Sequence, residues 1–213
     1  MIPIHEMLHT FLGEGRMSGL RCVIIRTHGC NLKCSWCDTP QDRVAPRPLP
    51  VEEIVAAVRP ANAGAVLITG GEPLLHDETP LLAEKLLGLG LKVLVETNGS
   101  LDIAPLPAEA IKIMDLKPPS SGFAQSSLLS NVKLLTGEDE IKIVIAGRED
   151  YLWARDIVEK ELGSFRGTIN LSPAWAENLL SLVAQWILED KMEARLNLQM
   201  HKIIFPDGEH ALL

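Results

Sequence analysis

Short apolar runs alternate with amphipathic stretches along most of the chain. Runs rich in Val, Ile and Leu are typical of buried strands, and they predict strands at residues 21–27, 65–69, 92–97, 111–116, 140–146, 168–171 and 194–199, after an extended segment at 2–9. Helical spacing predicts helices at residues 51–59, 78–87, 126–135, 150–162 and 176–189. Asp77 is the expected N-cap of the second helix, and a weaker helical segment is expected around Ala108.

The regular alternation of strand and helix favours a parallel sheet covered by crossover helices, which is an α/β fold. The β/α units fall short of the eight that close a full barrel. We therefore expect an incomplete, open βα barrel of about six parallel strands with outer helices. A chain of 213 residues suits one sizeable core, so residues 1–213 are expected to form a single domain.

Most of the polar and glycine-rich motifs follow a predicted strand, where the chemistry of such sheets gathers. These motifs are the string at residues 26–40 (RTHGCNLKCSWCDTP), GGEP at 70–73, TNG at 97–99, KPPSSG at 117–122 and Ser172-Pro173. The helix-to-strand connections carry no comparable polar set. An active site at the carboxyl ends of the strands is therefore expected.

Composition narrows the class of partner. The net charge of -8 and the pI of 5.3 disfavour a nucleic-acid-binding surface, so a small-molecule substrate is expected and no nucleic acid. The opening MIPIHEMLHT lacks the apolar core of a signal peptide, and no apolar run approaches the roughly 20 residues that span a bilayer. These features, and cysteines that are mostly clustered, favour a cytoplasmic protein without membrane contact.

The cysteine spacing Cys30-x3-Cys34-x2-Cys37 can bring three thiolates to one iron–sulfur cluster and leave one iron open to a small chelating ligand. The same thiols with His28 could instead form a Cys3His zinc site in a non-enzymatic interaction module, although zinc ligands more often come as two separated pairs. Cys22 lies in an apolar run and is interpreted as a small buried hydrophobe.

The three-cysteine spacing with Trp36 before the last Cys resembles the signature of radical S-adenosylmethionine (SAM) enzymes. The wider string from Gly29 to Thr39, together with GGEP and Gly13-Glu14-Gly15, is similar to the 7-carboxy-7-deazaguanine synthase family over nearly the whole chain. The resemblance implies a 4Fe–4S cluster on the three cysteines and SAM bound to the open iron. One-electron reduction then releases a 5'-deoxyadenosyl radical that removes a hydrogen atom.

The resemblance also implies a reaction. It is the conversion of 6-carboxy-5,6,7,8-tetrahydropterin to 7-carboxy-7-deazaguanine with loss of ammonia, in queuosine and 7-deazapurine biosynthesis. A homodimer and an electron donor such as flavodoxin or ferredoxin are expected with it. A radical SAM activase that makes a glycyl radical on a partner protein is a second enzymatic hypothesis. No side chain is assigned as catalytic beyond cluster-bound SAM.

For SAM, the family pattern maps onto residues of four motifs. Trp36 can offer its face to adenine, and the Gly-Gly-Glu string would hold the methionyl ammonium. The full set is Trp36, Asp38, Gly71, Glu72, Ser120, Ser121 and Ser172. Pro119 stands where the family often has Cys. Without the resemblance, GGEP is an ordinary strand-to-helix turn and Trp36 is a buried anchor.

For the substrate and its metal, the resemblance makes Thr39 a magnesium ligand, which suits a hard oxygen donor. The Glu14 carboxylate can accept two hydrogen bonds from a 2-aminopyrimidinone edge, and Arg26 can pair with a substrate carboxylate. Further substrate contacts are expected at Leu12, Gly13 and Thr69, with Leu12 replacing the usual Gln of the family. Gln199 and His201 lie in a string where the family's chain closes over the pocket, and they receive no role. Without the resemblance, Glu14 and Arg26 would each be interpreted as a solvated surface residue.

Overall fold

A twisted sheet of ten strands runs through the part of the chain that the computed structural model describes, which is residues 1–37, 39, 45–176, 178–205 and 211–212. The strands are β1 (Ile2–Phe11), β2 (Arg21–Thr27), β3 (Arg47–Leu49), β4 (Ala65–Gly70), β5 (Lys92–Thr97), β6 (Ile111–Leu116), β7 (Glu140–Ile145), β8 (Thr168–Pro173), β9 (Arg195–Leu196) and β10 (Ala211–Leu212). The α-helices are α1 (Val51–Val58), α2 (Thr79–Leu87), α3 (Arg148–Lys160), α4 (Leu179–Asp190) and α5 (Met200–Ile204).

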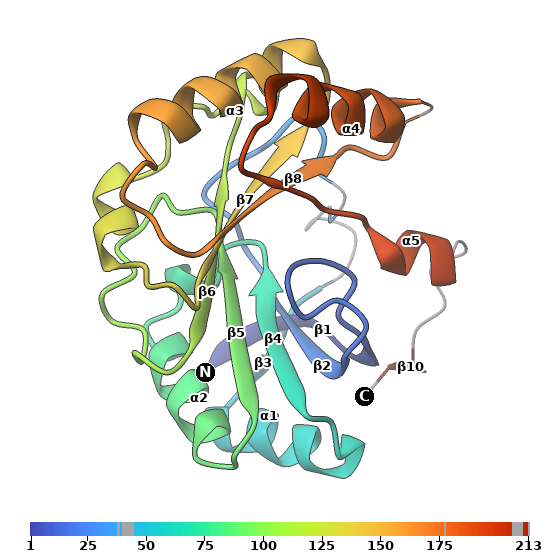
Figure 1. The fold of residues 1–213 in the computed structure, drawn as a ribbon. Helices are drawn as coiled ribbons and strands as arrows, with labels where there is room; N and C mark the ends of the chain where they lie inside the picture. Colours follow the sequence, from blue (N-terminus) through green and yellow to red (C-terminus); the bar gives the residue numbers. More distant parts are fainter. Residues whose placement is uncertain (38, 40–44, 177, 206–210, 213) are drawn as a thin grey trace.

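The strand order, β10-β1-β2-β4-β5-β6-β7-β8-β9, confirms an open, partial βα barrel. Every pairing from β2 to β9 is parallel, whereas β1 pairs antiparallel with β2, β3 and β10. Among the described residues the two edge strands, β9 and β10, do not pair with each other, so the sheet curls without closing. Figure 1 shows α1 and α2 beside β4 and β5, and α3 and α4 beside β7 and β8.

Alternation along the strands divides the core into an outer and an inner part. Outward side chains such as Val66 and Ile143 pack under the helices, where α1 contributes Ile54 at helical spacing and α3 contributes Tyr151. Inward apolar side chains plug one end of the barrel; these are Leu12, Cys22, Ala65, Leu94 and Ile113. Each large aliphatic side chain buried in this way stabilises the fold by roughly 1.5–3 kcal/mol. The carboxyl half of the barrel interior is left to polar residues.

The predicted helix near Ala108 is wrong. Residues 101–110 form turns, with Leu106 N–H donating to Ile103 O and Ala110 N–H to Pro107 O. Pro105 and Pro107 explain the turns, because prolines lack the N–H that a helix needs.

Other helix boundaries differ in smaller ways. Helix α2 begins at Thr79 with Glu78 as its cap, so Asp77 is not the N-cap. The helix predicted at 126–135 is only a short 3-10 helix, Leu129–Leu134. Three short elements were missed, namely β3, α5 and β10, and the last predicted strand, 194–199, shrinks to β9. None of the described helices is both long enough and apolar enough to cross a membrane.

Candidate active site

The cysteine loop follows β2 and rests on the GGEP turn that follows β4. The backbone N–H of Glu72 donates to Gly29 O at 2.8 Å, and Gly71 N–H donates to Thr27 O at 3.1 Å. A Cβ atom on Gly71 would lie 1.8 Å from Gly29 O, so only glycine permits this approach. The structure therefore brings the two predicted cofactor motifs into direct contact.

The three loop thiols carry no disulfide: Cys30 and Cys37 are exposed and Cys34 is half-buried. Cys30 Sγ accepts hydrogen bonds from Leu32 N at 3.4 Å and from Asn98 Nδ2 at 3.8 Å. Burial raises the pKa of Cys34, although the nearby Lys117 ammonium opposes the shift. Metal binding would displace the thiol proton, because the thiolate is the ligand.

This donor set fits an iron–sulfur cluster. Among the described residues, no three His, Cys, Asp or Glu side chains gather closely enough to hold a single metal ion. Cysteine thiolates are the usual ligands of iron–sulfur clusters, and this loop supplies three of them. Hydrogen bonds to the Cys30 sulfur are of the kind that tune such clusters.

The Trp36 side chain is hydrogen-bonded to the loop that follows β6. Its Nε1 donates to Ser120 Oγ at 2.9 Å, and Lys117 Nζ lies 5.2 Å from the ring centroid. Ser35 N–H donates to Ser121 O at 3.2 Å. Ser120 is in turn held by Asp150, whose carboxylate accepts from Ser120 N at 3.0 Å and from Ser120 Oγ at 2.6 Å. The predicted SAM residues Trp36, Ser120 and Ser121 are thus neighbours.

The Glu72 side chain is buried and makes its hydrogen bonds inside the protein. It is 0% exposed, and its carboxylate accepts hydrogen bonds from Thr97 Oγ1 at 2.8 Å, Asn98 N at 2.7 Å and Leu74 N at 3.0 Å. Burial raises its pKa, and these three donors oppose that shift. A ligand contact at this turn therefore falls to backbone atoms near Gly71. Asp38, also predicted to contact SAM, lies outside the described residues.

Glu14 lies in the β1–β2 loop and belongs to a network inside the barrel. Its Oε2 contacts Lys142 Nζ at 3.0 Å and accepts from Asn197 Nδ2 at 3.0 Å, while Oε1 accepts from Gln199 Nε2 at 3.3 Å. Ser172 Oγ accepts from the same Asn197 amide at 2.8 Å. The Ser172 side chain is thus part of the Glu14 network, and a SAM contact from this residue would come from its backbone.

Lys142 links that network to β5 and β4. Its Nζ contacts Glu96 Oε1 at 2.9 Å, and Glu96 Oε2 accepts from Thr69 Oγ1 at 3.2 Å. Burial alone would lower the pKa of Lys142, but the carboxylates of Glu14 and Glu96 outweigh it, and the pKa is well above its usual value. Burial likewise opposes ionisation of Glu96, yet Lys142 holds its pKa below the usual range. Lys142 and Glu96 are therefore both charged at neutral pH.

Arg26 stands at the mouth of the barrel beside the predicted metal residue. Its Nε donates to Glu6 Oε1 at 2.7 Å, across the β1–β2 pair, and its Nη1 donates to Thr39 Oγ1 at 3.4 Å. In the sheet Arg26 is the register partner of Thr69. Leu12 is buried in the inner apolar plug, which favours a backbone contact over a side-chain contact at that position.

Sequence reasoning missed Glu96, Lys142 and Asn197. A signal was present for the first two, because each is a charged residue within a strand rich in Val, Ile or Leu. A charge at such a position is costly unless it is paired, so it marks a polar interior. Asn197 gave no comparable signal.

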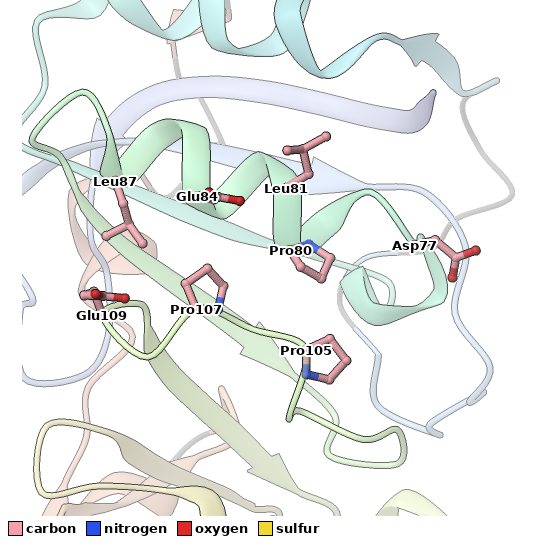
Figure 2. Close-up of a pocket in the computed structure, with 8 residues that line it drawn as sticks. All are labelled: Asp77, Pro80, Leu81, Glu84, Leu87, Pro105, Pro107 and Glu109. Atoms are coloured by element: carbon pink, nitrogen blue, oxygen red, sulfur yellow. The ribbon is translucent and has the colours of Figure 1, made fainter.

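A surface pocket lies away from these residues. Figure 2 shows it between α2 and the β5–β6 connection, and its volume is about 810 Å³. It is lined by Asp77, Pro80, Leu81, Glu84, Leu87, Pro105, Pro107 and Glu109. None of the predicted site residues lines this pocket.

A partial barrel with three free cysteines on the loop after its first parallel strand defines a radical SAM enzyme, and the Radical SAM superfamily profile matches residues 24–119. The chain is 37% identical to the 7-carboxy-7-deazaguanine synthase of Koribacter versatilis, covering 96% of this chain and 97% of the relative. It is also 37% identical to the synthase of Methanospirillum hungatei, covering 95% and 85%. The crystal structure of QueE from Escherichia coli superposes with a TM-score of 0.78 at 24% identity, covering 94% of each chain. The chain belongs to the 7-carboxy-7-deazaguanine synthase family.

Membership in this family implies a 4Fe–4S cluster, SAM and magnesium as cofactors and a small-molecule substrate. It decides against the glycyl-radical activase and against the zinc-stabilised module, since the full-length relatives are synthases.

Proposed function

We propose that this chain converts 6-carboxy-5,6,7,8-tetrahydropterin to 7-carboxy-7-deazaguanine with loss of ammonia, in the biosynthesis of queuosine and other 7-deazapurines. The observation that carries the proposal is similarity to the synthases over nearly the whole chain. The arrangement of the barrel supports it, because Arg26 on β2 leads into the cysteine loop and pairs in register with Thr69, and Glu14 is linked to Thr69 through Lys142 and Glu96.

The residues divide into three groups by role. Cys30, Cys34 and Cys37 would hold the cluster. SAM would be held by Trp36, Ser120, Ser121 and the backbone near Gly71. The resemblance to the family suggests further SAM contacts at Asp38, Glu72 and Ser172. Thr39 would bind magnesium. When bound, the cluster and SAM supply removal of a hydrogen atom from the substrate.

The chain's own contribution at the substrate is recognition of its two ends. The Glu14 carboxylate would accept hydrogen bonds from the 2-aminopyrimidinone edge of the pterin, and Arg26 would pair with the substrate carboxylate. The remaining contacts with the substrate would come from Leu12, Gly13 and Thr69. The polar interior above the apolar plug fixes these groups before the ligand arrives, which reduces the entropy lost on binding.

We also infer that residues 1–213 form one domain and that the enzyme is a cytoplasmic homodimer. Its electron donor would be a flavodoxin or ferredoxin. We expect it to bind neither nucleic acid nor a membrane. The continuous sheet supports a single domain. Exposed leucines at helical spacing on α4, Leu180 at 42% and Leu188 at 77%, are suited to a second copy.

The deciding experiment is anaerobic turnover by reconstituted protein with dithionite, SAM, magnesium and carboxytetrahydropterin. The deazaguanine product is expected. Formation of 5'-deoxyadenosine with untouched pterin would overturn the proposal. Cys34→Ala should abolish SAM cleavage, and Cys22→Ala is the matched control that should retain it, because Cys22 lies in the apolar plug.

A further inference from the structure

The Glu14 carboxylate is held asymmetrically. Lys142 and Asn197 both contact Oε2 at 3.0 Å, and Ser172 Oγ lies 3.5 Å from the same oxygen. Among the described residues, the one hydrogen bond to Oε1 is the longer 3.3 Å contact from Gln199. A carboxylate oxygen can accept more than one hydrogen bond, so Oε1 keeps capacity for a ligand while Oε2 is saturated.

Lys142 is itself anchored from the opposite side. It extends from β7 past β6 to reach Glu96 on β5 at 2.9 Å, and Glu96 also accepts from Thr69 on β4. Side-chain exposures of 13% for Lys142 and 20% for Glu14 leave little room for other rotamers. A nearly buried ammonium between two carboxylates is a rigid support, because moving either partner would leave a charge unpaired.

We propose that Lys142 is the positioning residue for pterin recognition. It is anchored by Glu96, it fixes Oε2 of Glu14, and it thereby keeps Oε1 available to the 2-amino edge of the substrate. The inference rests on the proposed function and adds the residues that set its specificity. Glu96 has a second part in this arrangement, since it links the Lys142 support to Thr69.

The test uses the reconstituted holoenzyme carrying Lys142→Met, with Lys112→Met as the matched control. Lys112 is also a buried lysine on a barrel strand, but its Nζ donates to Ala108 O at 3.0 Å and contacts no carboxylate of the site. Three quantities are compared: the KM for carboxytetrahydropterin, pterin-free SAM cleavage, and the kcat/KM ratio between the substrate and its analogue without the 2-amino group.

In Lys142→Met we expect the pterin KM to rise by about tenfold or more, as for loss of a charged hydrogen-bond partner. The preference for the 2-amino group should fall by a similar factor, while cluster content and pterin-free SAM cleavage stay unchanged. Lys142→Arg should recover part of the preference, because a guanidinium can still pair with both carboxylates. Lys112→Met should keep the wild-type preference.

The proposal is overturned if Lys142→Met keeps the wild-type KM and preference, or if the two Met variants lose both alike, which would indicate a merely structural role. If Lys142→Met fails to fold, Glu96→Gln decides, since it weakens the anchor and leaves the Lys142–Glu14 contact. A smaller loss of preference supports the proposal, and no loss overturns it. Failure of the wild type to turn over pterin overturns the proposed function together with this inference, whereas wild-type turnover with unchanged variants overturns this inference alone.

Discussion

At the scale of single residues, the thiols differ in reactivity because burial sets how much thiolate each can form. Burial raises the pKa of Cys22 to about 12 and also raises that of Cys34, whereas Cys30 and Cys37 are exposed. A raised pKa means that the reactive thiolate appears only at higher pH. In cluster-free protein at mildly alkaline pH, iodoacetamide should label Cys30 and Cys37 first, Cys34 more slowly, and Cys22 only after unfolding.

Timed peptide mass spectrometry measures this order. Labelling of Cys22 as fast as Cys30 in folded protein would contradict the burial on which the prediction rests. The interpretation of Cys22 as a small buried hydrophobe is confirmed, since it is 0% exposed.

The Glu14 carboxylate is the second residue-scale test. Glu14→Ala should raise the pterin KM by about tenfold or more, because a charge-assisted hydrogen bond is lost, and it should spare uncoupled SAM cleavage. Steady-state kinetics and chromatography of 5'-deoxyadenosine separate the two effects. Glu138→Ala is a suitable control, because that carboxylate is 80% exposed. Equal loss of pterin turnover and SAM cleavage would refute the role of Glu14.

Local patterns in the sequence predicted the residues with distinctive chemistry, such as the cysteine triplet, but not the partners that hold them. Glu72 illustrates the limit: its type suggested a ligand contact, but its three internal donors come from the turn that follows and from the end of β5. Glu14 and Lys142 are likewise paired across 128 positions, which no local pattern encodes. Such pairings depend on strand register and barrel curvature.

At the scale of elements, the predicted bounds agree to within one residue for β2, β4, β5, β6 and β7. Runs such as residues 111–116 are buried on both faces, and continuous hydrophobicity marks such strands clearly. Helix ends were less certain because their caps use few side-chain bonds, as at α2. The short α5 lacks a buried face, so helical spacing could not reveal it.

Asp150 joins two elements around the cofactor loops. From the first turn of α3 it accepts from Ser120 N and Oγ after β6 and from Ala146 N at 2.9 Å after β7. Asp150→Asn would turn an amide donor toward at least one of these donors, which should lower the free energy of unfolding by about 1–3 kcal/mol. The SAM dissociation constant should rise as well, because Ser120 holds Trp36.

Thermal denaturation and SAM titration measure the two effects. Glu149→Gln is the control, since this neighbour on the same helical turn is exposed. If both variants bind SAM equally well, Asp150 has no part in positioning the loop.

At the scale of the whole molecule, the β1–β2 loop is hydrogen-bonded to the segment that links β9 to α5. Gly15 N–H donates to Asn197 Oδ1 at 2.9 Å, and Met200 N–H donates to Gly13 O at 2.9 Å. The partial barrel could be predicted from the count of β/α units, but this fastening could not, because it joins the start of the chain to its end. The loop that carries Glu14 is thereby made part of the barrel wall.

Glu140 tests whether this fastening supports substrate binding. It is 1% exposed, its oxygens accept from Arg16 N at 3.0 and 3.1 Å, and Asn170 Nδ2 donates to Oε2 at 2.6 Å. Glu140→Gln should lower the free energy of unfolding by about 1–3 kcal/mol, because one donor loses its acceptor. It should also raise the pterin KM while SAM cleavage persists, since the loosened loop carries Glu14 and no cysteine. Glu138→Gln is the matched control, because Glu138 pairs with the same Arg16 at 3.0 Å on the surface, where an ion pair contributes little. Equal KM values in the two variants would show that the barrel wall holds Glu14 without this buried carboxylate.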